Sequence, residues 1–174
     1  MSEIIWTPRN DTPPLTQLAT KRPTVTVLNH LNAANYPHPV PVISFNEWNG
    51  SAPGQRHEYP LGTHHVDIQR IHCDDVEEHI DSSYRLFDYI DALKILTFLD
   101  KYRGQDIMVH CAAGISRSPA CAKYMVDYLG YNLSEFNSSP TFFAAHNTHV
   151  YYTLKRAGLD RPSTLEHIKG IQHD

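Results

Sequence analysis

The sequence has little cysteine, no long apolar run and no cluster of positive charge, and each absence excludes a class of protein. Three cysteines among 174 residues are too few for a disulfide framework, which favours a reducing compartment. No stretch reaches the roughly 18 apolar residues that a membrane-spanning helix needs. The formal net charge of −4 gives no basic surface for nucleic acid or an anionic membrane. We expect a cytoplasmic monomer that binds neither.

The N-terminus also lacks the pattern of a secretory leader, because MSEIIWTPRN has no charged start followed by an apolar run. Four prolines within residues 1–23 predict an irregular arm. The ordinary globular composition and length of the remainder predict one domain over residues 24–174. Within it, residues 49–63 hold three glycines and two prolines and predict a long loop.

The pattern of apolar residues predicts an α/β fold. β-Branched and apolar residues indicate strands at 24–28, 40–45, 64–71 and 106–110. Helices are expected from Ser82 or Ser83 to about residue 102, over 116–129 and over 141–157, with Gly104, Gly130 and Gly158 at their ends. This order favours a central, mostly parallel sheet of four to five strands flanked by helices. In such sheets the active site lies at the carboxyl ends of the strands.

The strand at 106–110 leads directly into HCAAGISRS, which runs from His110 to Ser118. Its spacing, H-C-x2-G-x2-R-S, fixes five positions that ordinary residue usage matches by chance in on the order of one chain in 10⁵. A strand, a glycine-containing loop and a helix start follow one another here. The motif therefore falls where the fold class places an active site.

Such a loop can curl until its backbone N–H groups point inward and, with the start of the next helix, cradle a phosphate dianion. The same field stabilises a thiolate on Cys111, and the Arg117 guanidinium can grip two phosphate oxygens. Ser118 can donate a hydrogen bond to the sulfur, and His110 can orient the loop through a ring N–H. The phosphate-binding residues are then Ala112, Ala113, Gly114, Ile115, Ser116 and Arg117.

A free cysteine is most often a small buried hydrophobe, and we assign that role to Cys121, which shares a helix face with Ala120 and Met125. The same interpretation does not suit Cys111. An inert cysteine requires neither an arginine six residues later nor a glycine between the two. We therefore predict Cys111 as the nucleophile and Arg117 as the phosphate clamp.

The segment VHCAAGISRSPA resembles the signature loop of the protein-tyrosine/dual-specificity phosphatase superfamily. The resemblance covers residues 24–129 in the order of elements, and its specific motif is about ten residues long. It implies a phosphotyrosine-phosphatase-like fold and a two-step reaction through a phosphocysteine intermediate, with no metal and no other cofactor. The small chain resembles the compact dual-specificity branch or its microbial members.

Such enzymes take the proton for the leaving group from an aspartate a few dozen residues before the cysteine. The corresponding region reads IHCDDVEE, between a strand and the first long helix. Asp74 and Asp75 both qualify as the general acid. We favour Asp75, because the Asp-Val step resembles the acid loop of related small phosphatases. The acidic residues that follow read as solvated groups near a helix start.

The loop carries Ala112, Ala113 and Ile115 and no lysine, whereas related phosphoinositide phosphatases place basic residues there. We therefore expect a phosphorylated protein as substrate, with the choice between phosphotyrosine and phosphoserine or phosphothreonine left open. Two alternatives remain. One is a phosphate-binding pseudophosphatase without turnover, and the other is a rhodanese-like or arsenate-reductase-like enzyme with a cysteine in a short anion-binding loop.

Three further signals carry less weight. The twelve histidines do not show the ligand spacing of a metal site, so none is predicted. Cys73 lies two residues before Asp75 and could trap an oxidised Cys111 as a disulfide, although an ordinary strand-end thiol is the simpler interpretation. Asn147 could brace the active-site loop, and an ordinary helix position is again the simpler interpretation.

Overall fold

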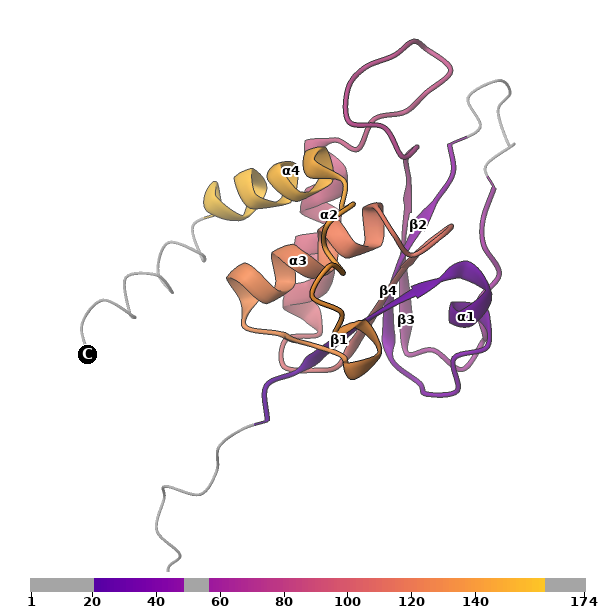
Figure 1. Cartoon of the computed structure of the whole chain (residues 1–174), viewed down its shortest axis with the longest axis vertical. Helices are drawn as coiled ribbons and strands as arrows, with labels where there is room; N and C mark the ends of the chain where they lie inside the picture. The colour runs from indigo at the N-terminus through magenta and orange to yellow at the C-terminus, as the bar shows by residue number, and fades with distance from the viewer. Residues whose placement is uncertain (1–20, 49–56, 162–174) are drawn as a thin grey trace, which may run out of the picture.

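Residues 21–48 and 57–161 are described by the computed structural model (Figure 1). Residues 1–20 of the predicted arm and residues 49–56 of the predicted loop lie outside the described part, as do residues 162–174. In the two described ranges, no helix is both long enough and apolar enough to cross a membrane.

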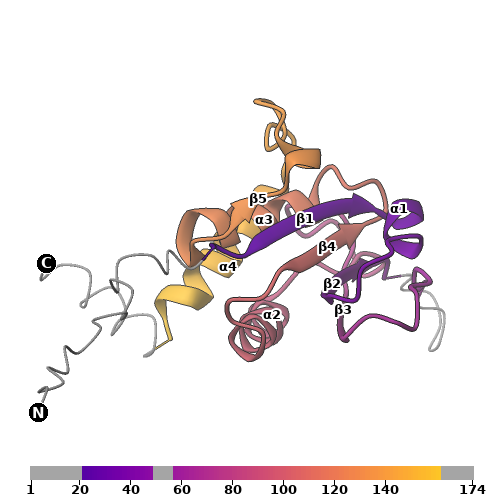
Figure 2. The same cartoon turned by 90° about the horizontal axis from the view of Figure 1, so that it is seen from below.

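The centre of the fold is a five-stranded sheet in which every neighbouring pair of strands is parallel. The predicted α/β class, with a parallel sheet of four to five strands, is confirmed. Its order in space is β3-β2-β4-β1-β5, and Figure 2 shows β1 and β4 side by side. The strands are β1 (Thr24–Asn29), β2 (Pro41–Asn46), β3 (Asp67–His72), β4 (Ile107–Cys111) and β5 (Asn132–Leu133).

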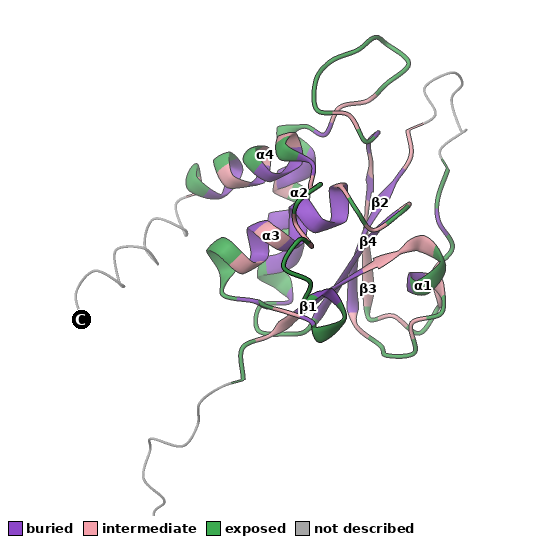
Figure 3. Ribbon diagram, viewed as in Figure 1, coloured by how far each residue is buried: buried purple, intermediate pink, exposed green. Residues whose placement is uncertain are grey.

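Three helices pack on one face of the sheet and a short helix packs on the other (Figure 1). The first set is α2 (Tyr89–Lys101), α3 (Arg117–Leu129) and α4 (Thr148–Leu159), and the short helix is α1 (His30–Ala34). Successive side chains of a strand point to opposite faces. In β4, Val109 and Cys111 therefore join the main core, whereas Met108 packs with Ala33 of α1. Figure 3 shows the buried residues concentrated in the strands and on the inner sides of these helices.

The predicted first long helix begins too early. α2 starts at Tyr89 with Asp88 as its N-cap, and not at Ser82 or Ser83. Asp88 accepts a hydrogen bond from the Asp91 N–H (2.9 Å), and the Asp91 carboxylate accepts one from the Asp88 N–H (3.4 Å). A serine cap satisfies one N–H group, whereas this reciprocal capping box satisfies two, so it sets the start of the helix.

The predicted last helix also begins too early, and it ends too soon. α4 starts after Asn147, which caps it by accepting a hydrogen bond from the Val150 N–H (2.9 Å). Gly158 does not end the helix, which continues to Leu159. A Cβ at Gly158 would lie 2.2 Å from the hydroxyl oxygen of Tyr124 in α3. This glycine therefore allows two helices to pack closely.

The sequence does not predict α1, β5 or a 3₁₀ turn at Glu135–Asn137, because each is too short for a periodic apolar pattern. The 3₁₀ turn nevertheless completes one edge of the sheet. The Asn137 Oδ1 accepts from the Val27 N–H (2.9 Å), and its Nδ2 donates to the Val27 carbonyl (3.0 Å). β5 pairs with β1 only at Thr24 and Val25. Further along β1, the Asn137 side-chain amide makes the two hydrogen bonds to Val27 that a longer β5 would otherwise make.

Replacement of Asn137 by alanine is expected to lower the free energy of unfolding by about 3 kcal/mol, because two buried backbone groups of β1 lose their partners. Urea-induced unfolding followed by circular dichroism measures this loss. The matched control is Ser138→Ala at the next, exposed position, which should cost less than about 0.5 kcal/mol. Equal stability of the Asn137→Ala protein and the wild type would contradict this role of the amide.

Candidate active site

Cys111 is the last residue of β4, and it is 2 % exposed. β4 lies between β2 and β1 in a parallel sheet. The thiol therefore lies at the end of the sheet where the carboxyl ends of these three strands meet. The Sγ atom accepts hydrogen bonds from the Gly114 N–H (3.3 Å) and from the Ser118 hydroxyl (3.1 Å). Both donors point at the sulfur, which is therefore a hydrogen-bond acceptor at the start of the loop.

Gly114 allows the loop after Cys111 to curl back against β1. Its φ is +73°, a left-handed backbone conformation that residues other than glycine rarely adopt. A Cβ at this position would lie 2.9 Å from the Asn29 nitrogen and 3.0 Å from the Leu28 carbonyl carbon. Both the backbone angle and the close approach therefore require glycine here.

The carbonyl oxygens on either side of this curl are bound from outside the loop. The Ala112 carbonyl accepts from the His30 N–H (3.2 Å) and from the His30 ring Nδ1 (2.8 Å), which therefore carries the proton. The Ser116 carbonyl accepts from the N–H groups of Asn147 and Ala120, each at 3.1 Å. With these oxygens held outward, the N–H groups between them are free to face the inside of the curl.

Four of these N–H groups donate no hydrogen bond to any described residue: those of Ala113, Ile115, Ser116 and Arg117. Ser116 occupies the N-cap position of α3, yet its side chain makes no capping hydrogen bond and instead donates to Asp75. The start of α3 is therefore left open. Unpaired N–H groups at a helix start form a binding site for an anion such as phosphate.

Arg117 is the last residue of this loop and the first of α3, and it is 1 % exposed. Its Nη1 donates to the Cys73 carbonyl (2.5 Å), and its Nη2 donates to the Glu47 carboxylate (2.5 Å). Its Nε is buried and has no partner among the described residues. Burial would lower the pKa of Arg117, but the hydrogen bond and charge of Glu47 outweigh it and raise the pKa. A second, longer hydrogen bond joins Nη1 to the Asn46 carbonyl (3.4 Å). The guanidinium is thus a fixed cation, and the N–H of Nε and the second N–H of Nη2 make no hydrogen bond to a described residue.

Glu47 and Tyr59 complete the support of Arg117, and neither belongs to a motif in the sequence. The Tyr59 hydroxyl donates to the Glu47 Oε1 (3.1 Å), and its ring stacks on His30 with 4.8 Å between ring centroids. Burial and the neighbouring Glu47 carboxylate raise the pKa of Tyr59 to about 12. Glu47 directly follows β2, so its place after a strand that ends at the active-site edge is the one signal that could have found it.

The two candidate acids have different surroundings. Asp75 is exposed, and its Oδ1 accepts from the Ser116 hydroxyl (2.7 Å) and from the Asn147 Nδ2 (2.9 Å). Asp74 is buried, and its carboxylate accepts from the backbone N–H groups of Trp48 (3.1 Å) and Arg85 (2.8 Å). The structure therefore brings Asp75 to the anion-binding loop, whereas Asp74 holds the backbone of its own region together.

His110 lies at the base of the loop, but its side chain points to the face of the sheet opposite Cys111, as alternation in β4 requires. Its ring packs edge-on against Tyr59 with 6.1 Å between ring centroids. Neither ring nitrogen makes a well-formed hydrogen bond to a described residue, although a weak interaction with the Cys111 backbone remains. Burial lowers the pKa of His110 to about 4. The ring is therefore neutral at physiological pH.

The other two cysteines are buried and free. Burial raises the pKa of Cys121 far above its ordinary range, which fits the inert role predicted for it. Burial also raises the pKa of Cys73 to about 12, so Cys73 holds almost no thiolate at neutral pH. Its carbonyl group, rather than its sulfur, contacts the site through Arg117. A disulfide between Cys73 and Cys111 stays a hypothesis.

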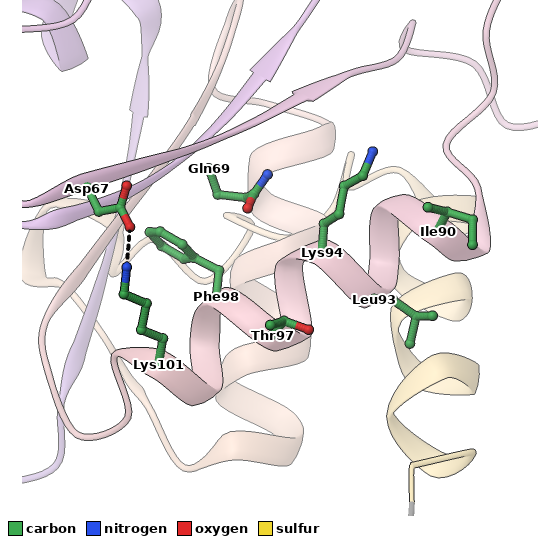
Figure 4. A pocket seen from close by; sticks show the side chains of 8 residues that line it. All are labelled: Asp67, Gln69, Ile90, Leu93, Lys94, Thr97, Phe98 and Lys101. Atoms are coloured by element: carbon green, nitrogen blue, oxygen red, sulfur yellow. Dashed lines mark hydrogen bonds and ion pairs between the residues drawn. The ribbon is translucent and has the colours of Figure 1, made fainter.

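Elsewhere on the surface, a hollow of about 420 Å³ lies between β3 and α2 (Figure 4). Asp67 and Lys101 form an ion pair (2.9 Å) at one end of it, and Phe98 forms part of its wall. None of the residues that line this hollow belongs to the loop around Cys111. Across the described residues, no three His, Cys, Asp or Glu side chains are grouped so as to hold a metal ion.

No family model, no curated protein and no solved structure matches this chain. Any functional assignment therefore depends on the residues of the site and their geometry. That geometry comprises a buried sulfur with two donors, an open helix start, a fixed guanidinium and an exposed carboxyl group next to them.

The neutral state of His110 predicts a loss of stability in mild acid. The unfolded chain binds a proton on this histidine near pH 6.5, whereas the folded chain does so only near pH 4. The free energy of unfolding therefore decreases as the pH falls from about 6.5 towards 4. The decrease due to His110 is about 2 kcal/mol between pH 7 and pH 5. Urea-induced unfolding at a series of pH values measures this change in the free energy of unfolding.

His110→Gln should remove this part of the pH dependence, whatever it does to stability at pH 7. His79→Gln, at an exposed position, is the control and should keep the dependence of the wild type. If the wild type and His110→Gln lost the same free energy between pH 7 and pH 5, the buried neutral histidine would not be the cause.

Proposed function

We propose that this chain is a cysteine-dependent phosphomonoesterase of the protein-tyrosine/dual-specificity phosphatase superfamily, acting on phosphorylated proteins. The observation that carries the proposal is the position of the Cys111 sulfur, held by two donors at the mouth of a loop whose N–H groups are unpaired. The buried Arg117 supplies a fixed positive charge to the same loop. The free cysteines fit a reducing compartment such as the cytoplasm.

In the first step, the phosphoryl group of the substrate lies in the loop, where the backbone N–H groups and the Arg117 Nε bind its oxygens. The Cys111 thiolate attacks phosphorus, a sulfur–phosphorus bond forms, and the bond to the leaving oxygen breaks. Asp75 gives its proton to that oxygen, because an alkoxide or phenoxide is a poor leaving group. The products are the dephosphorylated protein and a phosphocysteine.

In the second step, a water molecule gives a proton to the Asp75 carboxylate and attacks the phosphocysteine. The new oxygen–phosphorus bond forms as the sulfur–phosphorus bond breaks, and inorganic phosphate leaves. The Ser118 hydroxyl donates to the sulfur at 3.1 Å, which stabilises the thiolate as it departs. The starting protonation state of Asp75 and the thiolate of Cys111 are both restored.

The exposed surface of the loop supports a protein substrate over a polyanionic lipid headgroup. Ala113 and Ile115 are its exposed residues, and neither adds positive charge to that of Arg117. Asp75 also lies beside the loop and is negative when ionised. A headgroup with several phosphates would meet only one buried cation here, whereas a single phosphorylated side chain needs no more.

Purified protein is expected to hydrolyse an aryl phosphate and a phosphotyrosine peptide with a chelator present, because the reaction needs a thiolate and no metal. Cys111→Ser should lower kcat by about 1,000-fold or more, since it removes the nucleophile. Cys121→Ala is the matched control at a buried thiol and should keep its activity. Tight vanadate binding without turnover would instead support the pseudophosphatase, and transfer of sulfur from thiosulfate to cyanide would support the rhodanese-like alternative.

The two aspartates are distinguished by the leaving group of the substrate. Asp75→Asn is expected to lower kcat on phosphotyrosine by about 100-fold, and on an activated aryl phosphate by much less, because an activated phenoxide leaves without a proton. Asp74→Asn should instead lower the free energy of unfolding by about 1 to 2 kcal/mol and leave the ratio of the two rates unchanged. Equal and mild effects of both variants on both substrates would remove Asp75 from the mechanism.

A further inference from the structure

Asn147 connects the start of α4, the Asp75 carboxyl group and the end of the anion-binding loop, and the proposed reaction depends on how these three parts are positioned relative to one another. It is the N-cap of α4 and is 2 % exposed. Its Nδ2 donates to the Asp75 carboxylate (2.9 Å), and its backbone N–H donates to the Ser116 carbonyl (3.1 Å) at the end of the anion-binding loop. Its own Oδ1 accepts from the Val150 N–H (2.9 Å), which fixes the side chain to the helix.

The hydrogen bonds to Asp75 all use one of its two carboxyl oxygens. Oδ1 accepts from Asn147 and from the Ser116 hydroxyl, whereas Oδ2 accepts from no described residue. A carboxyl proton is carried by the oxygen that is not already saturated with donors. The two donors therefore set the orientation of the carboxyl group and leave Oδ2 for proton transfer.

The segment that carries Asp75 cannot hold this orientation by itself. Residues 73–88 form no helix and no strand. They are attached to the start of α4 by two more contacts, in which Asn147 Nδ2 donates to the Val76 carbonyl (3.4 Å) and the Thr148 N–H donates to the Glu77 carboxylate (2.5 Å). The start of α4 and the Ser116 hydroxyl together therefore hold Asp75 at the loop.

We infer that Asn147 is a positioning residue for the general acid, an inference that rests on the phosphatase activity proposed above. It holds the Asp75 carboxyl group at the mouth of the anion-binding loop, with Oδ2 available to the leaving oxygen. It does not touch the reacting atoms itself. Its removal should therefore affect the step that needs a proton and spare the attack of the sulfur.

Two variants separate this role from the capping of α4. Serine and aspartate are both good N-caps, so Asn147→Ser and Asn147→Asp should keep the helix start. Asn147→Ser removes the donor to Asp75 and is expected to lower kcat on a phosphotyrosine peptide by about tenfold with little change in KM. Asn147→Asp replaces the donor to Asp75 with an acceptor and should also lower that kcat, because the Asp75 carboxyl group loses the hydrogen bond that orients it. Both should keep kcat on an activated aryl phosphate within about twofold of the wild type.

Thr148→Ala is the matched control, at the next and exposed position of the same helix start, and should leave both rates unchanged. The double variant Asp75→Asn/Asn147→Ser should be no slower on phosphotyrosine than Asp75→Asn alone, because Asn147 acts through Asp75. Thermal unfolding of each variant measures any loss of stability separately from the rates.

The outcomes separate this inference from the proposed function. Equal losses on the two substrates, or additive losses in the double variant, would overturn the positioning role while the phosphatase activity of the wild type still stood. If the wild type hydrolysed neither substrate, the proposed function would fail first, and the role of Asn147 would fail with it.

Discussion

The start of α3 lacks a capping side chain, and the rest of the site is arranged around its unpaired N–H groups. A helix start carries partial positive charge and needs acceptors. Ser116 stands in the capping position but donates its hydroxyl to Asp75, so it does not satisfy the helix. Pro119, two residues into α3, has no N–H and removes one unsatisfied donor. The N–H groups of Ala113, Ile115, Ser116 and Arg117 make no hydrogen bond to a described residue. Unpaired N–H groups at a helix start favour an anion.

The buried guanidinium of Arg117 would destabilise the fold if it stood alone. Arg117 avoids that cost because its partners come from the ends of two neighbouring strand regions, the Glu47 carboxylate after β2 and the Cys73 carbonyl after β3. Tyr59 in turn donates to Glu47 and stacks on His30, whose ring binds the Ala112 carbonyl. One continuous set of contacts therefore supports both the Ala112 carbonyl of the loop and the Arg117 guanidinium.

The long elements of the fold follow from the apolar pattern of the sequence, and their boundaries do not. The starts of α2 and α4 depend on Asp88 and Asn147, whose side chains reach groups three residues further along the chain. Competing polar residues precede each of them, so local propensity alone does not choose among the possible caps. Gly158 looks like a helix end in sequence, but the Tyr124 hydroxyl of another helix explains it. Tertiary packing overrode the local signal at that position.

The sequence by itself brought together the cysteine, the glycine, the arginine and the serine of the loop, because these residues lie within eight positions and their spacing carries the geometry. It also determined the parallel α/β class, since apolar strands alternate with amphipathic helices. Only the tertiary structure decided that Asp75 and not Asp74 contacts the loop, that Glu47 and Tyr59 support Arg117, and that the Asn147 side chain binds Asp75. Glu47 and Arg117 stand 70 positions apart, and Asn147 and Asp75 stand 72 apart. They meet because parallel strands end at one edge of the sheet, and no local pattern in the chain encodes that distance.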